Sequence, residues 1–217
     1  MTREVIRALD VADDGCIRTR EELMSDRRAS ISRKTNETDI QLVLNLDGTG
    51  QSSVSTGIGF FDHMLQSLSR HSAMDLALTC KGDVHIDDHH TVEDCAIVLG
   101  QAFEKALGDK TGIARFGSAC APLDEALARA VVDLCGRPCA VIDLQLDDSM
   151  LGTMTARNLE HVLESFAVNA RMTLHVDVLR GKNNHHRAEA AFKALALAIR
   201  SAIRITGTGI PSTKGVL

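Results

Sequence analysis

The sequence predicts an α+β fold in which two similar halves form one domain. The repeat is carried first by HHTVE at residues 89–93, which returns as HHRAE at residues 185–189, 96 positions later. Upstream of these, FDHML at residues 61–65 matches LEHVL at residues 159–163, 98 positions later. A period of this length is too long for a solenoid repeat and indicates a duplicated half-domain. Two such halves commonly pack about a pseudo-two-fold axis, so we expect the two His-His-Glu segments to lie near each other.

Composition restricts the class of protein. With 217 residues, 44% of them hydrophobic, the chain is long enough to bury a proper core. A net charge of −5 and the absence of Trp and Tyr argue against nucleic-acid binding and favour small-molecule chemistry. No stretch of about 18 apolar residues and no apolar N-terminal segment occurs, so we expect no membrane span or secretory signal and a cytoplasmic location. The six scattered cysteines favour free thiols.

The first half covers about residues 30–110 and follows an N-terminal extension, residues 1–29, which has no clear role. Alternating apolar residues predict its strands, and glycines near the helix ends mark the starts and stops. The expected elements are a strand-like segment from residue 31, strands at 40–46 and 52–56, a helix at about 60–70, a strand at 74–79 and a helix from the first His-His-Glu segment to about 107.

The second half covers about residues 122–206, after a connection at 110–122 and before a C-terminal tail at 207–217. Its expected elements are strands at 128–134 and 140–146, a helix at about 156–169, a strand at 172–179 and a helix from the second His-His-Glu segment to about 204. Each half therefore follows the order strand, strand, helix, strand, helix. This shared order supports the duplication.

Six of the nine histidines occupy equivalent places in the two halves. On a helix, side chains four residues apart lie on one face within about 6 Å of each other, so His89 with Glu93 and His185 with Glu189 each form a chelating pair. The other histidine of each pair points about 100° away. Under two-fold pairing of the halves, we expect one metal centre to contain His89, Glu93 and His186 and the other to contain His90, His185 and Glu189, with His63 and His161 each adding a fourth ligand. Nitrogen and oxygen donors of this kind suit Mn, Fe, Co, Ni or Zn.

Two further interpretations concern the surroundings of the His-His-Glu segments. In a purely structural alternative, the segments are polar helix starts with Asp88 and Asn184 as N-caps. Basic residues surround the second segment, including Arg180, Lys182 and Lys193, and the tail offers hydroxyls and a lysine. This combination favours a phosphate-binding site on that side.

From about residue 31 to the C-terminus, the chain resembles the imidazoleglycerol-phosphate dehydratase family of histidine biosynthesis. The resemblance rests on FDHML at 61–65, GDVHIDDHHTVED at 82–94, APLDEA at 121–126, GKNNHH at 181–186 and PSTKGVL at 211–217. It implies halves of the ribosomal protein S5 domain 2-like type, each a four-stranded sheet with two helices. It also implies two manganese ions per active site, one held by His63, His89, Glu93 and His186 and the other by His90, His161, His185 and Glu189. It further implies a 24-subunit homo-oligomer with active sites between subunits.

The resemblance implies dehydration of imidazole glycerol phosphate to imidazole acetol phosphate. We expect Glu37 to be the general base that removes the carbon-bound proton. The candidate substrate contacts are Glu37, His71, Arg115, Arg137, Lys193, Ser212, Thr213 and Lys214, where Thr213 replaces a serine that is common in the family. Two other functions fit the same residues: a dinuclear metallohydrolase that cleaves a phosphate ester, and a metal-binding oligomer without catalysis.

Overall fold

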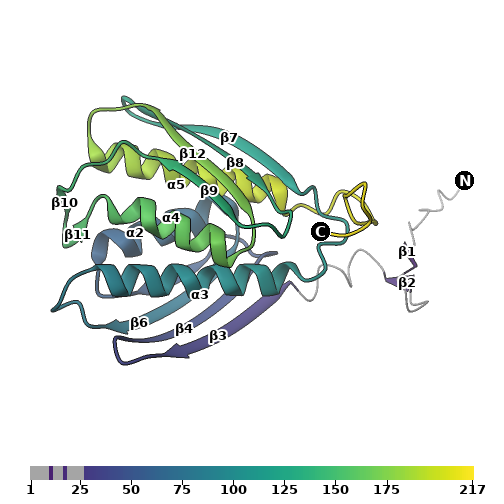
Figure 1. Cartoon of the computed structure of the whole chain (residues 1–217), viewed down its shortest axis with the longest axis horizontal. Helices are drawn as coiled ribbons and strands as arrows, with labels where there is room; N and C mark the ends of the chain where they lie inside the picture. The colour runs from purple at the N-terminus through teal and green to yellow at the C-terminus, as the bar shows by residue number, and fades with distance from the viewer. Residues whose placement is uncertain (1–9, 12–16, 19–26) are drawn as a thin grey trace, which may run out of the picture.

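A computed structural model describes residues 10–11, 17–18 and 27–217. In this described part of the chain, two four-stranded sheets lie on the outside and four helices lie between them (Figure 1). The first half forms β3 (Arg28–Lys34), β4 (Thr38–Asn45), β5 (Ser52–Ser55), α2 (Gly59–Ser72), β6 (Asp75–Gly82) and α3 (His89–Leu107). The second half forms β7 (Phe116–Leu123), β8 (Ala126–Asp133), β9 (Cys139–Asp143), α4 (Asn158–Asn169), β12 (Thr173–Arg180) and α5 (Asn184–Ala202). Two short hairpins complete the description: β1 (Asp10–Val11) with β2 (Ile17–Arg18), and β10 (Met150–Leu151) with β11 (Met154–Thr155).

The two sheets have the same topology. Their strand orders are β3-β4-β6-β5 and β7-β8-β12-β9, and in each sheet the last pair is parallel while the other two pairs are antiparallel. In β4 the buried residues Ile40, Leu42 and Leu44 alternate with Asp39, Gln41 and Val43, so one face packs on the helices. The predicted α+β fold of two duplicated halves, each a four-stranded sheet with two helices, is therefore confirmed.

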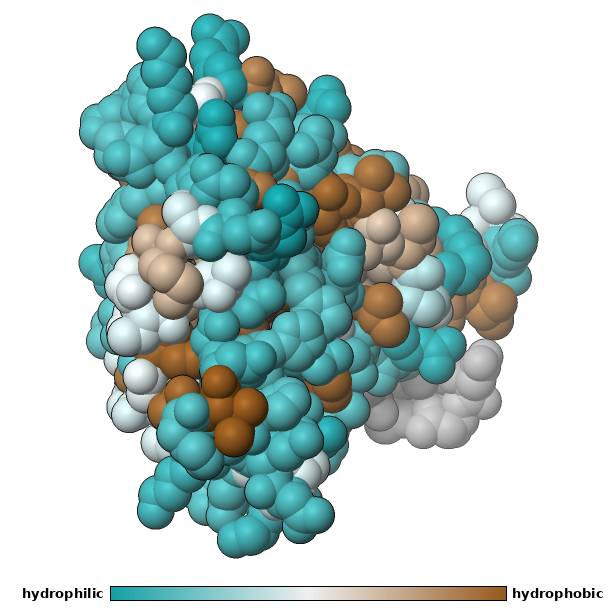
Figure 2. Space-filling model, turned by 60° about the vertical axis from the view of Figure 1, so that its left-hand side comes forward, coloured by the Kyte–Doolittle hydropathy of each residue, from teal (hydrophilic) through white to brown (hydrophobic). Residues whose placement is uncertain are grey.

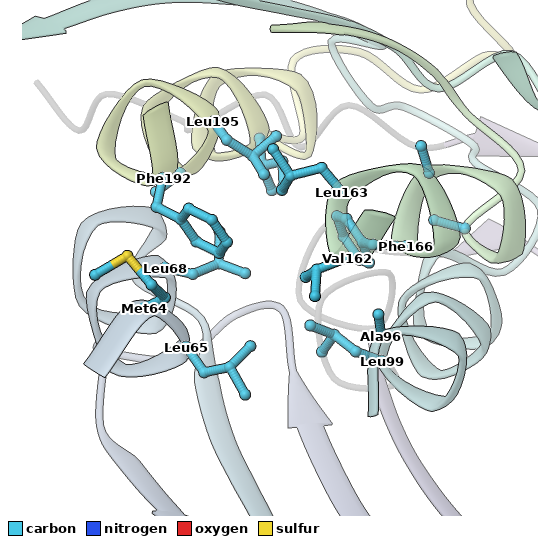
Figure 3. Packing of buried hydrophobic residues seen from close by; sticks show 14 of the residues in the cluster. Met64, Leu65, Leu68, Ala96, Leu99, Val162, Leu163, Phe166, Phe192 and Leu195 are labelled. Carbon is cyan, nitrogen blue, oxygen red and sulfur yellow. The ribbon is translucent and has the colours of Figure 1, made fainter. Parts of the chain in front are cut away.

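The four helices exchange partners between the halves. Helix α2 packs on α5, and α3 packs on α4. Apolar side chains from all four helices, among them Leu65, Leu99, Leu163 and Phe192, point toward a shared centre (Figure 3). The buried core around it also contains Met64, Leu68, Ala96, Val162, Phe166 and Leu195. Because each helix pair contains one helix from each half, polar residues at the ends of these helices also meet across the halves.

Three boundaries differ from the predicted ones. The first strand begins at Arg28, and the buried Arg27 pairs with Asp47, so these residues belong to the domain and not to the extension. The predicted connection at 110–122 contains most of strand β7, and the hairpin at 150–155 was not predicted. The sequence of β7, FGSACAPL, is poor in β-branched residues because α5 packs tightly on it: a Cβ on Gly117 would lie 1.9 Å from the carbonyl oxygen of Ala198. Each half therefore has three strands of its four-stranded sheet before its first helix, and the second half also has the β10–β11 hairpin there.

Most of the predicted N-terminal extension lies outside the described residues. Among the described residues, no helix has both the length and the apolar character needed to cross a membrane.

Candidate metal centres

The first turns of α3 and α5 position the paired histidines. The backbone N–H of His89 donates to Asp87, and the backbone N–H groups of His185 and His186 donate to Asn183. The helix starts are thus held by Asp87 and Asn183, which are 96 positions apart like the histidines themselves. In the structural alternative the expected caps lie one position later in each half. Asp88 does occupy the N-cap position of α3 but makes no side-chain capping bond, and Asn184 is already the first residue of α5, so the expected cap there is wrong. Asp88 accepts from Thr155 and Asn158, and Asn184 donates to Asp147 and Ser149.

One group of possible ligands, which we call the His89 cluster, consists of His89, Glu93 and His161. Nε2 of His89 lies 3.6 Å from Oε2 of Glu93, and Nε2 of His161 lies 3.1 Å from Oε1 of the same carboxylate. The Nε2 atom of His161 is buried and has no hydrogen-bond partner among the described residues. One potential ligand atom from each residue lies within 4.8 Å of the others. A buried, unsatisfied ring nitrogen that faces a carboxylate fits a metal ligand.

The second group, the His185 cluster, consists of His63, His185 and Glu189. Oε1 of Glu189 lies 2.8 Å from Nε2 of His63 and 3.3 Å from Nε2 of His185. The other oxygen, Oε2, lies 2.6 Å from Nζ of Lys193. Burial by itself would raise the pKa of Glu189, but the hydrogen bonds from Lys193 and His63 outweigh burial and lower this pKa to about 2. The carboxylate is therefore ionised, as a metal ligand must be.

The expected division of the upstream histidines between the two centres is wrong within one chain. His63 joins His185 and Glu189, and His161 joins His89 and Glu93. The physical reason is the exchange of helix partners, since His63 lies on α2, which packs on α5, and His161 lies on α4, which packs on α3. Sequence spacing correctly placed His89 near Glu93 and His185 near Glu189, but it could not show which helix would pack on which.

His90 and His186 belong to neither cluster among the described residues. Nδ1 of His90 lies 3.0 Å from Oδ2 of Asp83, and Nδ1 of His186 lies 2.6 Å from Oε2 of Glu125. These hydrogen bonds are the main reason that the pKa of each histidine is raised. Sequence analysis did not find the role of Glu125. It lies in the connection between β7 and β8, and only the folded sheet brings it to α5.

Some candidate substrate contacts lie near the clusters. Oε1 of Glu37, in the turn between β3 and β4, lies 3.9 Å from Nε2 of His90. Lys193 contacts the His185 cluster directly through Glu189. His71 lies two turns after His63 on α2. Burial is the main reason that the pKa of His71 is lowered, and the positive charge of Lys193 nearby lowers it further. These three residues therefore line the same end of the molecule as the clusters.

The candidate phosphate contacts gather elsewhere in the chain. Arg115 donates from Nε and Nη2 to both carboxylate oxygens of Asp133, and from Nη1 to the carbonyl oxygen of Pro211, at 2.7, 3.1 and 2.8 Å. The bond to Asp133 is the main reason that the pKa of Arg115 is raised. Arg115 thus ties the tail that holds Ser212, Thr213 and Lys214 to the sheet. Arg137 is exposed. It lies beside this tail, because the preceding residue, Gly136, is close to Leu217.

Strand β7 separates the two sets. Arg115 precedes β7, and Glu125, which contacts His186, follows it. The eight residues of β7 alone span about 26 Å at roughly 3.3 Å per residue, and Arg115 and Glu125 lie beyond its two ends. The start of β7 and the C-terminal tail lie toward the right-hand side of Figure 1, and the first turns of α3 and α5 lie toward the left-hand side. Figure 2 turns that left-hand end toward the viewer and shows that mainly hydrophilic residues cover it.

The fold and the two clusters together define a class of duplicated α+β proteins with paired His-His-Glu helices. The model of the imidazoleglycerol-phosphate dehydratase family matches residues 56–199, and the chain belongs to this family. Its members are hydro-lyases of histidine biosynthesis, so the chain is an enzyme of this class.

Several relatives carry the same name. A protein of Phytophthora nicotianae is 62% identical over 192 residues, which cover 88% of this chain but 42% of that longer protein. A protein of Methanothermobacter thermautotrophicus is 51% identical over 195 residues, which cover 90% of this chain and 100% of that protein. The crystal structure of the dehydratase from Pyrococcus furiosus has a TM-score of 0.75 at 35% identity and covers 86% of this chain and 100% of that chain. The fold similarity thus extends over both halves.

Proposed function

We propose that this chain converts D-erythro-imidazole glycerol phosphate to imidazole acetol phosphate by loss of water, as a step of histidine biosynthesis. The observation that carries the proposal is the pair of equivalent three-residue clusters, each made of two histidines and one glutamate, in a member of this enzyme family. Two equivalent clusters suit an imidazole ring, because that ring has two nitrogen atoms to present.

The proposal includes two Mn²⁺ ions per active site. His89, Glu93 and His161 would hold one ion, and His63, His185 and Glu189 would hold the other. Imidazole nitrogen with carboxylate oxygen is a donor set that first-row transition metals accept, in contrast to the oxygen-only shells of Ca²⁺ and Mg²⁺. When bound, such ions supply Lewis acidity that favours loss of a proton from the substrate's imidazole ring.

The remaining chemistry falls to residues of this chain. The carboxylate of Glu37 is half exposed and lies next to His90, where it would remove the carbon-bound proton as general base, a role typically worth about 10²- to 10⁴-fold. Arg115, Arg137, Ser212, Thr213 and Lys214 would bind the phosphate and fix the orientation of the substrate. His71 and Lys193 would line the metal-binding end of the site.

We infer that each active site forms between copies of this chain. The clusters and the phosphate-binding residues of one chain lie about 30 Å apart along β7, which is too far for one small substrate to bridge. His90 and His186 would complete the clusters of neighbouring copies, because neither belongs to a cluster of its own chain among the described residues. A closed homo-oligomer, of 24 copies as the family resemblance implies, would provide these neighbours.

The proposed partners are thus a phosphorylated small molecule and further copies of the chain, with neither nucleic acid nor a membrane. The proposed location is the cytoplasm. Cys80, Cys95, Cys120, Cys135 and Cys139 are free, which fits a reducing compartment.

The purified full-length chain, supplied with Mn²⁺ and imidazole glycerol phosphate, should form the ketone product, and a chelator should stop the reaction. Release of inorganic phosphate without ketone would instead support a phosphate-ester hydrolase, and bound metal without turnover would support a non-catalytic metal-binding oligomer. Replacement Glu37→Gln should lower kcat by about 10²-fold or more at unchanged metal content. Turnover within a few-fold of the unaltered enzyme would show that Glu37 is not the base.

A further inference from the structure

The two histidines outside the clusters are held in matching ways by carboxylates from different structural elements. Asp83 directly follows β6, and Glu125 lies between β7 and β8. Each carboxylate contacts Nδ1 of its histidine, at 3.0 Å for Asp83 with His90 and at 2.6 Å for Glu125 with His186. The two carboxylates are not repeats of each other in the sequence, so the same contact is built twice from different parts of the fold.

The contact determines which nitrogen of each ring is available. A neutral imidazole carries one proton, and a carboxylate at Nδ1 keeps that proton on Nδ1 and leaves the lone pair on Nε2. Within the described part of the chain, the carboxylates within 4 Å of these Nε2 atoms are Glu37, at 3.9 Å from His90, and Asp124, at 3.7 Å from His186. Both rings therefore present the lone pair of Nε2 at the surface of the chain, where it can serve as a metal ligand.

We propose that Asp83 and Glu125 are positioning residues that fix the tautomer and the ring orientation of His90 and His186 so that each presents Nε2 to a metal ion held by a neighbouring copy. This inference rests on the proposed function, because it needs the two histidines to be metal ligands. Carboxylates that bond the second nitrogen of a ligating histidine also make the ring a stronger donor, and their loss typically lowers metal affinity about 10- to 100-fold.

Glu125 has a second contact that a test must separate from the first. Its other oxygen, Oε1, accepts the backbone N–H groups of Lys182 and Asn183, both at 3.0 Å, and so fastens the start of α5 to the β7–β8 connection. Replacement Glu125→Ala removes both contacts. Replacement Glu125→Gln keeps the carbonyl oxygen for the backbone and turns an amide N–H₂ toward Nδ1 of His186. The amide would then donate to Nδ1 and move the ring proton to Nε2, which blocks the ligand atom.

At Asp83 the order of the two replacements is reversed, because the amide variant is the milder change there. The Oδ1 atom of Asp83 is buried and has no hydrogen-bond partner in the part of the chain that the structure describes. In Asp83→Asn the carbonyl oxygen can therefore face Nδ1 without loss of another contact, whereas Asp83→Ala leaves Nδ1 with no acceptor. We expect Asp83→Ala to weaken metal binding more than Asp83→Asn.

The experiment is a titration of metal-free, full-length protein with Mn²⁺, in which the free ion is followed by its electron paramagnetic resonance signal. Glu125→Gln, Glu125→Ala and Asp83→Ala should each weaken one class of Mn²⁺ sites about 10- to 100-fold. Asp39→Asn is the matched control, because Asp39 pairs with Lys34 at the surface and contacts no histidine. This control should bind Mn²⁺ like the unaltered protein.

The possible outcomes are distinct. If Glu125→Ala weakens binding and Glu125→Gln does not, Glu125 only fastens the backbone, and the inference is wrong for that residue. Unchanged affinity in Asp83→Ala would contradict the inference for Asp83. If the unaltered protein itself binds no Mn²⁺, the proposed metal chemistry fails, and this inference fails with it.

Discussion

Nε2 of His63 lies 2.8 Å from Oε1 of Glu189, although the two residues are 126 positions apart and belong to different halves of the chain. The same exchange places His161 of the second half beside Glu93 of the first. Neither half therefore contains a complete cluster, and the packing of α2 on α5 and of α3 on α4 is what assembles both. Duplication supplied the ligand types, and the helix layer between the sheets determines their grouping.

Replacement Glu189→Gln should remove one metal ion and leave the other. The amide is a poorer metal ligand than the carboxylate, and His63 and His185 would lose the oxygen donor that lies between them. We expect the manganese content after desalting, measured by mass spectrometry, to fall from about two ions to about one per chain. The control is Glu104→Gln, because Glu104 lies near the C-terminal end of α3 and its side chain is about 40% exposed. This replacement should leave the manganese content unchanged. Loss of both ions, or of neither, would contradict two separate clusters.

Sequence reasoning was most successful where the pattern is local. The strand alternation around Ile40 and the spacing of His89 and Glu93 depend on neighbours within a few residues, and the structure retains both. It failed at β7, where Gly117 is required by the approach of α5, a contact that no local pattern records. It also failed in the grouping of His63, which depends on helix packing between the halves.

Replacement Gly117→Ala should destabilise the fold. The added Cβ would lie 1.9 Å from the carbonyl oxygen of Ala198, so β7 and α5 would have to move apart. Such overpacking typically costs about 1–3 kcal/mol and can cost more. Gly59→Ala is the matched control, because its added Cβ would have no atom within 4 Å and its backbone needs no positive φ. Urea denaturation should show a lower midpoint for Gly117→Ala only, and equal midpoints would contradict the close approach.

Asp75 should stabilise the protein more at neutral pH than in acid. Burial alone would raise the pKa of Asp75, but hydrogen bonds from backbone N–H groups, including those of Thr49 and Gln51, outweigh burial and lower it. The stabilisation is therefore complete above the unfolded pKa of about 3.9 and is lost as the pH falls through the lower folded pKa. We expect Asp75→Ala to cost about 1 kcal/mol of unfolding free energy at pH 7, since part of the carboxylate faces solvent, and less at pH 3. A cost that is equal at both pH values would contradict this account.

Replacement Arg115→Lys should weaken substrate binding and loosen the tail. Lysine cannot reproduce the paired bonds to Asp133 together with the bond to the carbonyl of Pro211. We expect KM to rise about tenfold or more, and limited proteolysis to cut the tail sooner. Arg129→Lys is a matched control, because Arg129 makes a similar pair with Asp177 on the same sheet but contacts no tail residue. An unchanged KM in Arg115→Lys would remove this arginine from the phosphate site.

Active sites between copies should allow two inactive variants to rescue each other. Glu189→Gln damages a cluster, and Arg115→Ala damages the phosphate contact about 30 Å away along β7. If one copy supplies the cluster and another supplies the arginine, a random 1:1 mixed oligomer has both parts intact in about one quarter of its sites. Ketone formation by co-assembled protein should therefore approach about one quarter of the unaltered rate.

The control mixture for this rescue combines Glu189→Gln with His63→Ala. Both residues belong to the His185 cluster. Because neither kind of chain in this mixture has that cluster intact, no site in the mixed oligomer contains an intact His185 cluster. This mixture should stay inactive. Affinity tags of two kinds, recovered together on gel filtration, verify that the copies have mixed. If mixed oligomers of Glu189→Gln and Arg115→Ala form but produce no ketone, each chain must bring both parts to its own site, and the tail would have to reach the clusters within one copy.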